Sequence, residues 1–422
     1  MVIAKNPFGR VTRISRRTLA PAVAAPGTAD TSGSRTGVLV LIAMYGGNDG
    51  ENTIIPYNDP AYLGGRPTLG YQPHEVIPLD KDLALHPGLT GMKGLWDAKQ
   101  LAIVRGVGYP EPNHSHFRSM DIWQSAVPER DELTGWIGRW LDTGGGKDPL
   151  AALSLGPTLP KILGGRTTAG AAIPAGTLAL PKGGRIEGPF ATVESGQVPG
   201  SLAARVARSG TDLLPVIHSV KDVLASQPAS AFTTSLEGAP AETAPKDAVN
   251  PGGAGKPLKP KGGGLSSQLD LVARLIKGGL PTRVYVVGMG GFDTHTNERA
   301  NHANLMSELD TGITSFVKAM SGDPRGKEVV VMTFSEFGRR VAQNASGGTD
   351  HGTAAPLFVA GPGVKGGYYG EQPGLATPDL DHGDLRFTTD FRSVYSTVAD
   401  RILGADPAAL LGPQRFPTLD FI

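Results

Sequence analysis

The sequence predicts an α/β protein whose central sheet is mostly parallel and carries helices on both faces. Five short apolar runs have the length of strands, and segments with helical spacing of apolar residues lie between several of them. Apolar runs without polar alternation indicate strands that are buried on both faces, as in parallel sheets. Strands that alternate with helices along a chain predict a sheet covered by those helices.

The elements follow in chain order from these patterns. The expected strands are residues 37–44, 101–107, 283–289, 328–334 and 357–360. Arg105 interrupts the apolar run of the second strand. The expected helices are residues 116–125, 133–141, 265–276, 302–320 and 391–403. With 422 residues, of which 39% are hydrophobic, the chain can bury one large core.

The middle of the chain differs in composition from the rest. Residues 143–263 are rich in Gly, Pro, Ala and Thr, and one amphipathic segment, residues 202–224, interrupts them. We expect this stretch to be an insertion or cap on a single domain that spans residues 37–422. Residues 240–262 have the composition of a flexible loop, because they carry too little apolar surface to become ordered.

Residues 1–36 form a basic leader, whereas the rest of the chain is mildly acidic. The leader contains six basic residues and one acidic residue, and Arg16-Arg17 resembles the twin-arginine export signature. A weakly apolar segment and small residues follow the pair, which predicts an export signal and linker. The alternative is a disordered basic tail. The export interpretation implies the twin-arginine export machinery as a partner and a periplasmic or secreted protein.

Charge and composition exclude other classes of protein. The formal net charge of +1 argues against nucleic-acid binding. The absence of cysteine excludes disulfides and thiolate metal sites. Outside the leader, the longest apolar run is residues 38–44, far shorter than the ~20 residues of a membrane span, so we expect no stable span.

Polar residues follow the first two strands, at the sheet edge where ligands of open parallel sheets bind. Asp49 follows the first strand within a Gly-rich segment, as a ligand for a cation or simply as a turn residue. Ser115, flanked by His114 and His116, stands at the expected start of a helix and is followed by Arg118. Ser115 is a candidate nucleophile and Arg118 a candidate clamp for an anionic group. An ordinary helix cap is the alternative interpretation of Ser115 and is compatible with that role, and the two flanking histidines favour function.

The later strands lead to further polar residues. Asp293 and His295 follow the third strand, Glu336 follows the fourth, and Asp350-His351 precede the fifth. Arg339 and Arg340 are either anion-binding or solvated helix residues. A mixed set of carboxylates and imidazoles suits zinc, manganese or iron.

The order of these motifs resembles family 1501 of the domains of unknown function. The motifs are Gly-Gly-Asn-Asp-Gly at 46–50, Pro-Asn-His-Ser-His-Phe at 112–117, Gly-Gly-Phe-Asp-Thr-His at 290–295, Thr-Phe-Ser-Glu-Phe-Gly-Arg-Arg at 333–340 and Gly-Thr-Asp-His-Gly at 348–352. The resemblance covers about residues 37–422, and a twin-arginine-like leader is typical of the family. The family is grouped by fold with the alkaline phosphatase and sulfatase superfamily, which implies an alkaline phosphatase-like sheet with a Gly/Pro-rich insertion.

The resemblance also implies a function and a site. It implies a metal-dependent hydrolase of small phosphate or sulfate esters, with Ser115 as nucleophile and one or two divalent ions held by Asp49, Asp293, His295, Glu336 and His351. The chain departs from the superfamily in having Glu336-Phe337 where an Asp-His pair is usual, and in the short spacing between Asp293 and His295. The alternative is therefore a non-catalytic exported protein of the same fold that binds anions or assists assembly.

Overall fold

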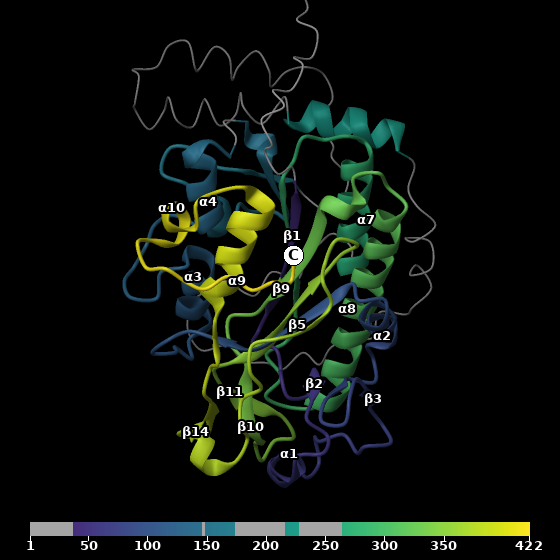
Figure 1. Cartoon of the computed structure of the whole chain (residues 1–422), viewed down its shortest axis with the longest axis vertical. Helices are drawn as coiled ribbons and strands as arrows, with labels where there is room; N and C mark the ends of the chain where they lie inside the picture. The colour runs from purple at the N-terminus through teal and green to yellow at the C-terminus, as the bar shows by residue number, and fades with distance from the viewer. Residues whose placement is uncertain (1–36, 146–147, 174–215, 228–263) are drawn as a thin grey trace, which may run out of the picture. The chain divides into compact units, whose positions relative to one another are not determined.

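The computed structural model describes residues 37–145, 148–173, 216–227 and 264–422, which belong to one compact unit, Arg35–Ile422. Its centre is a sheet with the strand order β13-β5-β12-β9-β1-β8-β6-β7, and β16 pairs with β5 (Figure 1). The strands are β1 Val38–Tyr45, β5 Leu101–Gly108, β6 Ala152–Leu155, β7 Ala171–Ile173, β8 Val284–Gly290, β9 Val329–Phe334, β12 Ala355–Ala360, β13 Gly367–Tyr369 and β16 Thr389–Asp390.

The predicted mostly parallel sheet is confirmed. Strand β1 pairs in parallel with both β8 and β9, and β6 pairs in parallel with β8. Strand β12 is antiparallel to both of its neighbours, β9 and β5. Because β12 runs in the opposite direction, the residues before it lie at the same edge as the residues after the parallel strands.

Strand β1 shows why this sheet is buried on both faces. All residues from Val38 to Met44 are buried. Val40 and Ile42 belong to the core on one face, whereas Leu39 and Leu41 belong to the core on the other. The uninterrupted apolar run is therefore buried on both faces of the sheet, as its composition predicts.

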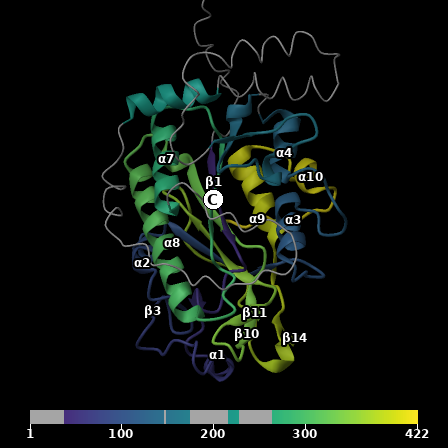
Figure 2. The ribbon, with the colours of Figure 1, turned by 180° about the vertical axis from the view of Figure 1, so that it is seen from behind.

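Helices cover both faces, as expected (Figures 1 and 2). One face is covered by α2 Thr90–Asp97, α7 Leu265–Lys277 and α8 Glu298–Ser321, whose apolar residues join the first core. The other is covered by α3 His116–Ser125, α4 Trp136–Trp140, α9 Phe391–Val398 and α10 Pro407–Leu411. Among the described residues, no helix is long and apolar enough to cross a membrane.

Smaller elements gather beyond the edge where β1 ends. They are β2 Ile54–Ile55, α1 Pro60–Gly65, β3 Ile77–Pro78, β4 Ala84–Leu85, β10 Arg339–Gln343, β11 Thr349–His351, β14 Leu380–Asp381 and β15 Asp384–Leu385. Strands β10 and β11 form an antiparallel hairpin in which Arg339 is opposite His351. Of the two alternatives for Arg339 and Arg340, that they are solvated helix residues is therefore wrong.

The predicted insertion is described only in part. Strands β6 and β7 fall within residues 143–263 yet belong to the central sheet, so the sheet reaches at least residue 173. Residues 216–226 are helical, as expected for the end of the amphipathic segment. Residues 1–36, residues 202–215 and the expected flexible loop at 240–262 lie outside the described residues.

Candidate metal centre

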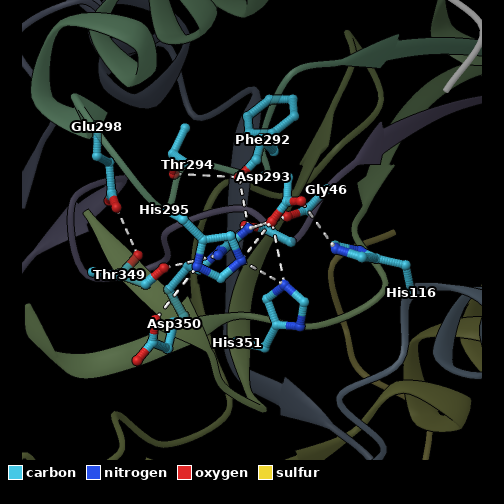
Figure 3. A network of polar contacts seen from close by, with 12 residues as sticks. Gly46, His116, Phe292, Asp293, Thr294, His295, Glu298, Thr349, Asp350 and His351 are labelled. Atoms are coloured by element: carbon cyan, nitrogen blue, oxygen red, sulfur yellow. Dashed lines mark hydrogen bonds and ion pairs between the residues drawn. The ribbon is translucent and has the colours of Figure 1, made fainter. Parts of the chain in front are cut away.

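Three histidines and one aspartate converge at the edge where the parallel strands end (Figure 3). His116 begins α3, Asp293 and His295 follow β8, and His351 ends β11. Asp293 Oδ1 lies 3.2 Å from His351 Nε2 and 3.1 Å from His295 Nε2, and Asp293 Oδ2 lies 3.4 Å from His116 Nε2. The Nε2 atoms of His295 and His351 are 3.0 Å apart.

These separations match those between the ligands of one metal ion. Ligand bonds of ~2.1 Å in a tetrahedral site place neighbouring donor atoms roughly 3.4 Å apart. One donor atom each from His116, Asp293 and His351 all lie within 4.8 Å of one another. His295 Nε2 approaches two of these three residues and is the natural fourth ligand. The residues present therefore fit one divalent cation.

The Nδ1 atom of each imidazole contacts an oxygen atom that orients the ring. His116 Nδ1 lies 2.8 Å from Glu336 Oε1, His351 Nδ1 lies 2.8 Å from the carbonyl of His114, and His295 Nδ1 lies 3.4 Å from Asp350 Oδ1. Carbonyl and carboxylate oxygens only accept hydrogen bonds, so each Nδ1 is the donor. In the neutral form each Nε2 then directs a lone pair toward Asp293, the arrangement usual for metal-bound histidines.

The charge of the centre is concentrated on Asp293. Burial opposes its ionisation, but Arg339 and the rings of His116 and His351, whose Nε2 atoms donate to it when the rings are protonated, hold the pKa of Asp293 well below its usual range. Burial likewise lowers the pKa of His116, yet the bonds to Asp293 and Glu336 outweigh burial and raise it to about 9. Nε2 of His116 is buried, and Asp293 Oδ2 lies 3.4 Å from it. The centre thus favours a positive charge between these groups.

Arg339 fixes the loops that carry the ligands. Its side chain is fully buried and donates to Asp293 Oδ1 at 2.7 Å. It also donates to backbone carbonyls of three loops, those of Gly46, Gly47, Phe292 and Thr349. Arg339 is therefore a structural residue, and its donors are not available to a ligand.

Phe337 forms the apolar wall of the centre. Its ring lies 4.9 Å from that of His116 and 4.7 Å from that of His351, measured between centroids. Gly47 permits this packing, because a Cβ at its positive φ of 76° would lie 2.4 Å from the Phe337 ring. Phe337 thus orients two imidazoles by contact.

Two of the five expected ligands lie outside the cluster. The carboxylate of Asp49 is fully buried and bound by both terminal nitrogens of Arg66. Glu336 stands behind His116, and its Oε1 also accepts from the backbone N–H of Gly46 at 2.9 Å. The structure brings together Asp293, His295 and His351 from the expected set and adds His116.

The two expected catalytic residues lie differently. Ser115 is exposed at the N-cap of α3, and its side chain makes no cap hydrogen bond. Arg118 points into the loop that follows α3, where it donates to Asp121 at 3.0 Å, to Asp131 at 2.9 Å and to two carbonyls. The sequence signal for His116 was its place beside Ser115 after a buried strand, but its role as a ligand was missed.

A buried polar layer lies behind the centre. Burial raises the pKa of Asp49, but Arg66 outweighs burial and keeps the Asp49 carboxyl ionised. Burial and the neighbouring Asp49 raise the pKa of Glu298 well above its usual value, which favours the uncharged form of this carboxyl. Thr349 Oγ1 donates to Glu298 Oε2 at 2.6 Å, which links this layer to the strand of His351 (Figure 3).

Fold and site together define an α/β protein with a candidate metal centre at the carboxyl edge of its sheet. Residues 194–410 match the family described as Protein of unknown function (DUF1501), and the chain belongs to this family. No curated protein matches the chain.

Solved structures of the alkaline phosphatase superfamily and of related hydrolases resemble the chain at low identity. A protein in the alkaline phosphatase superfamily from Vibrio parahaemolyticus is 10% identical, with a TM-score of 0.39, over 89% of this chain and 69% of that chain. A putative sulfatase from Bacteroides thetaiotaomicron is 11% identical, with a TM-score of 0.35, over 92% and 77% of the two chains. Phosphonate monoester hydrolase of Agrobacterium radiobacter is 11% identical, with a TM-score of 0.36, over 91% and 79%.

Proposed function

We propose that this protein is an exported, metal-dependent hydrolase of phosphate or sulfate esters. The observation that carries the proposal is the convergence of three oriented Nε2 atoms on the Asp293 carboxylate. Three imidazoles and one carboxylate suit zinc, manganese or iron better than calcium. A bound ion would act as a Lewis acid toward the ester and stabilise the attacking and leaving oxygens.

Ser115 is the residue proposed to attack the ester. It lies between His114, whose carbonyl positions His351, and His116, whose Nε2 faces Asp293. Since its side chain does not cap α3, the hydroxyl is available for reaction and the first N–H groups of the helix are available to the anionic group. Phe337 excludes water from one side of the imidazoles. The chain's own residues thus supply nucleophile, anion site and ligands.

A non-catalytic role is the second candidate, as an exported protein that binds anions or assists assembly. The position of Arg118 favours it, because Arg118 is bound to Asp121, Asp131 and nearby carbonyls and does not reach toward Ser115. Such a protein would keep the fold without a complete metal set and would cleave neither ester.

The first test measures metal and ester cleavage on the same preparations. The parent chain, purified without added metal, should contain about one zinc, manganese or iron per chain by elemental analysis. His116→Ala and His351→Ala should lose most of it, whereas His382→Ala, at an exposed histidine outside the centre, should not. After loading with each metal, the parent should hydrolyse 4-nitrophenyl phosphate or 4-nitrophenyl sulfate.

Ser115→Ala separates the two candidates. In a hydrolase it should keep the metal and lose at least 100-fold in kcat, since the nucleophile is gone. Ser346→Ala, which removes an exposed serine hydroxyl near the hairpin turn, is the control and should retain activity. Stoichiometric metal without cleavage of either ester in the parent would favour the binding role. A parent that gains no metal at neutral pH would exclude the metal-dependent hydrolase and leave the non-catalytic role.

Export through the twin-arginine machinery to the periplasm or beyond is part of the proposal. Its support is the Arg16-Arg17 pair in the basic leader. Replacing both arginines with lysine should keep the full-length protein in the cytoplasm, as judged by fractionation and mass. Export and trimming of the lysine variant at the level of the parent would refute this route.

A further inference from the structure

Glu51 is a buried carboxyl group with one oxygen atom that no described residue hydrogen-bonds. It lies just after β1, is 3% exposed, and its Oε2 makes no hydrogen bond within the described part of the chain. An unpaired buried polar group destabilises a fold, and an apolar residue in its place would not. Glu51 lines a pocket of about 10 Å³ between the end of β1 and strands β5 and β12, which has room for one water-sized group such as a hydroxyl.

A β-bulge directs Arg105 to the same pocket. Val104 is opposite Leu357 and Val107 is opposite Ala355, so Arg105 and Gly106 together face Pro356 alone. Gly106 has a positive φ of 56°, and Pro356 has no N–H that the bulge could leave unpaired. Bulges re-aim side chains, often beside functional sites.

Arg105 also has an unused donor. Its guanidinium lies 4.8 Å from the centroid of the Tyr368 ring, and Nη2 donates to the carbonyl of Gly370. Nε is buried, and none of the described residues accepts a hydrogen bond from it. Arg105 and Glu51 line one pocket without forming a mutual ion pair, so a group between them would satisfy both.

The remaining walls restrict what that group can be. Apart from Gln372 and two glycines they are apolar, formed by Ile54, Ala355, Pro356, Pro373 and Leu385. A hydroxyl group both accepts and donates hydrogen bonds, so a single hydroxyl can serve the arginine and the carboxyl at once. We propose that this pocket binds a hydroxyl group of a small neutral polyol, which accepts from Arg105 Nε and bonds to Glu51. The site shares no residue with the metal centre and does not depend on the proposed function.

The electrostatics of Glu51 agree with a neutral ligand. Burial raises its pKa to about 8, so at pH 7 the group is mostly an uncharged carboxyl. An uncharged carboxyl can donate to or accept from a hydroxyl, but it gives no strong attraction to a cation. The positive charge of Arg105 in turn disfavours a cationic ligand.

Binding of glycerol to the full-length protein tests the proposal. Titration calorimetry at pH 7 should show saturable binding to the parent. Glu51→Met and Arg105→Lys should each weaken it at least tenfold, because the first removes the carboxyl and the second removes the Nε donor. Glu51→Met should also melt at a higher temperature than the parent, since it removes an unpaired buried group. If Glu51→Met fails to fold, Arg105→Lys still tests the site.

Two control variants show whether glycerol binds in this pocket. Glu371→Met, at an exposed carboxyl next to the pocket residue Gln372, should leave glycerol binding unchanged. His295→Ala should also leave it unchanged, which separates this pocket from the metal centre. Absence of saturable binding in the parent would mean that the pocket holds only an ordered water. Equal binding by the parent, Glu51→Met and Arg105→Lys would place glycerol elsewhere. Either result overturns the proposal.

Discussion

The imidazoles of the metal centre are oriented by residues that would not touch a metal. Glu336, Asp350 and the carbonyl of His114 each accept from an Nδ1 atom and leave Nε2 facing Asp293. Such partners commonly set the metal affinity nearly as strongly as the ligands do. The properties of the centre should therefore respond to changes in residues one layer away.

Glu336→Gln tests this dependence. The amide keeps the size of the side chain but removes the charge that fixes the Nδ1 proton of His116, so we expect zinc affinity to fall roughly 10- to 100-fold. Competition with a chromogenic chelator measures the change. Glu371→Gln, at an exposed carboxyl, is the matched control. Equal affinity in the parent and Glu336→Gln would show that Glu336 does not tune the centre.

For single residues, the sequence predicted which side chains could bind a metal better than it predicted which residues they contact. Asp293, His295 and His351 were predicted because each stands at a strand end or just before a strand. Asp49 has the same sequence context, yet it binds Arg66, which ends α1 and folds back onto it. No local pattern distinguishes a carboxylate that meets a metal from one that meets a guanidinium.

At the scale of elements, the β10–β11 hairpin holds the centre together through Arg339. Replacing Arg339 with Met would leave Asp293 and several buried carbonyls without their donor, which should destabilise the fold by about 3–5 kcal/mol. Denaturant unfolding measures this loss. Arg340→Met is the control, because Arg340 is partly exposed and pairs with Asp384 at 3.2 Å, so its loss should cost less than about 1 kcal/mol. Similar losses for both variants would contradict the role of Arg339.

Long elements were predictable and short ones were not. All five strands and helix α3 appear close to their expected bounds, because continuous apolar runs and helical spacing are strong signals. The hairpin was missed because Arg339–Gln343 has no clear alternation, and it is held in place by contacts of the Arg339 side chain with distant loops. The reversed direction of β12, which brings His351 to the site, depends on pairing that no local pattern encodes.

For the whole molecule, Glu51 should make stability depend on pH. Below pH 4.5 the carboxyl is protonated in both states, whereas between 4.5 and about 8 only the folded state retains the proton. The free energy of unfolding should therefore fall as pH rises through this window, by on the order of 1 kcal/mol per pH unit, and level off above it. Glu51→Gln lacks this dependence and should gain stability relative to the parent from pH 5 to pH 8.

Urea unfolding at several pH values measures that difference. Glu371→Gln, at an exposed carboxyl, should follow the parent at every pH. A constant difference between Glu51→Gln and the parent across the window would show that Glu51 ionises normally in the folded protein.

The central position of β1 has a consequence for how the chain is synthesised. Strand β1 ends at residue 45, but its two partners begin only at residues 284 and 329. A ribosome therefore releases an apolar strand long before either neighbour exists, and both of its hydrogen-bonding edges stay open meanwhile. Open edges pair readily with other chains, and distant pairings form slowly. A nascent chain that stalls before residue 334 should aggregate, so the cell has to shield β1 until the last third of the protein has been made.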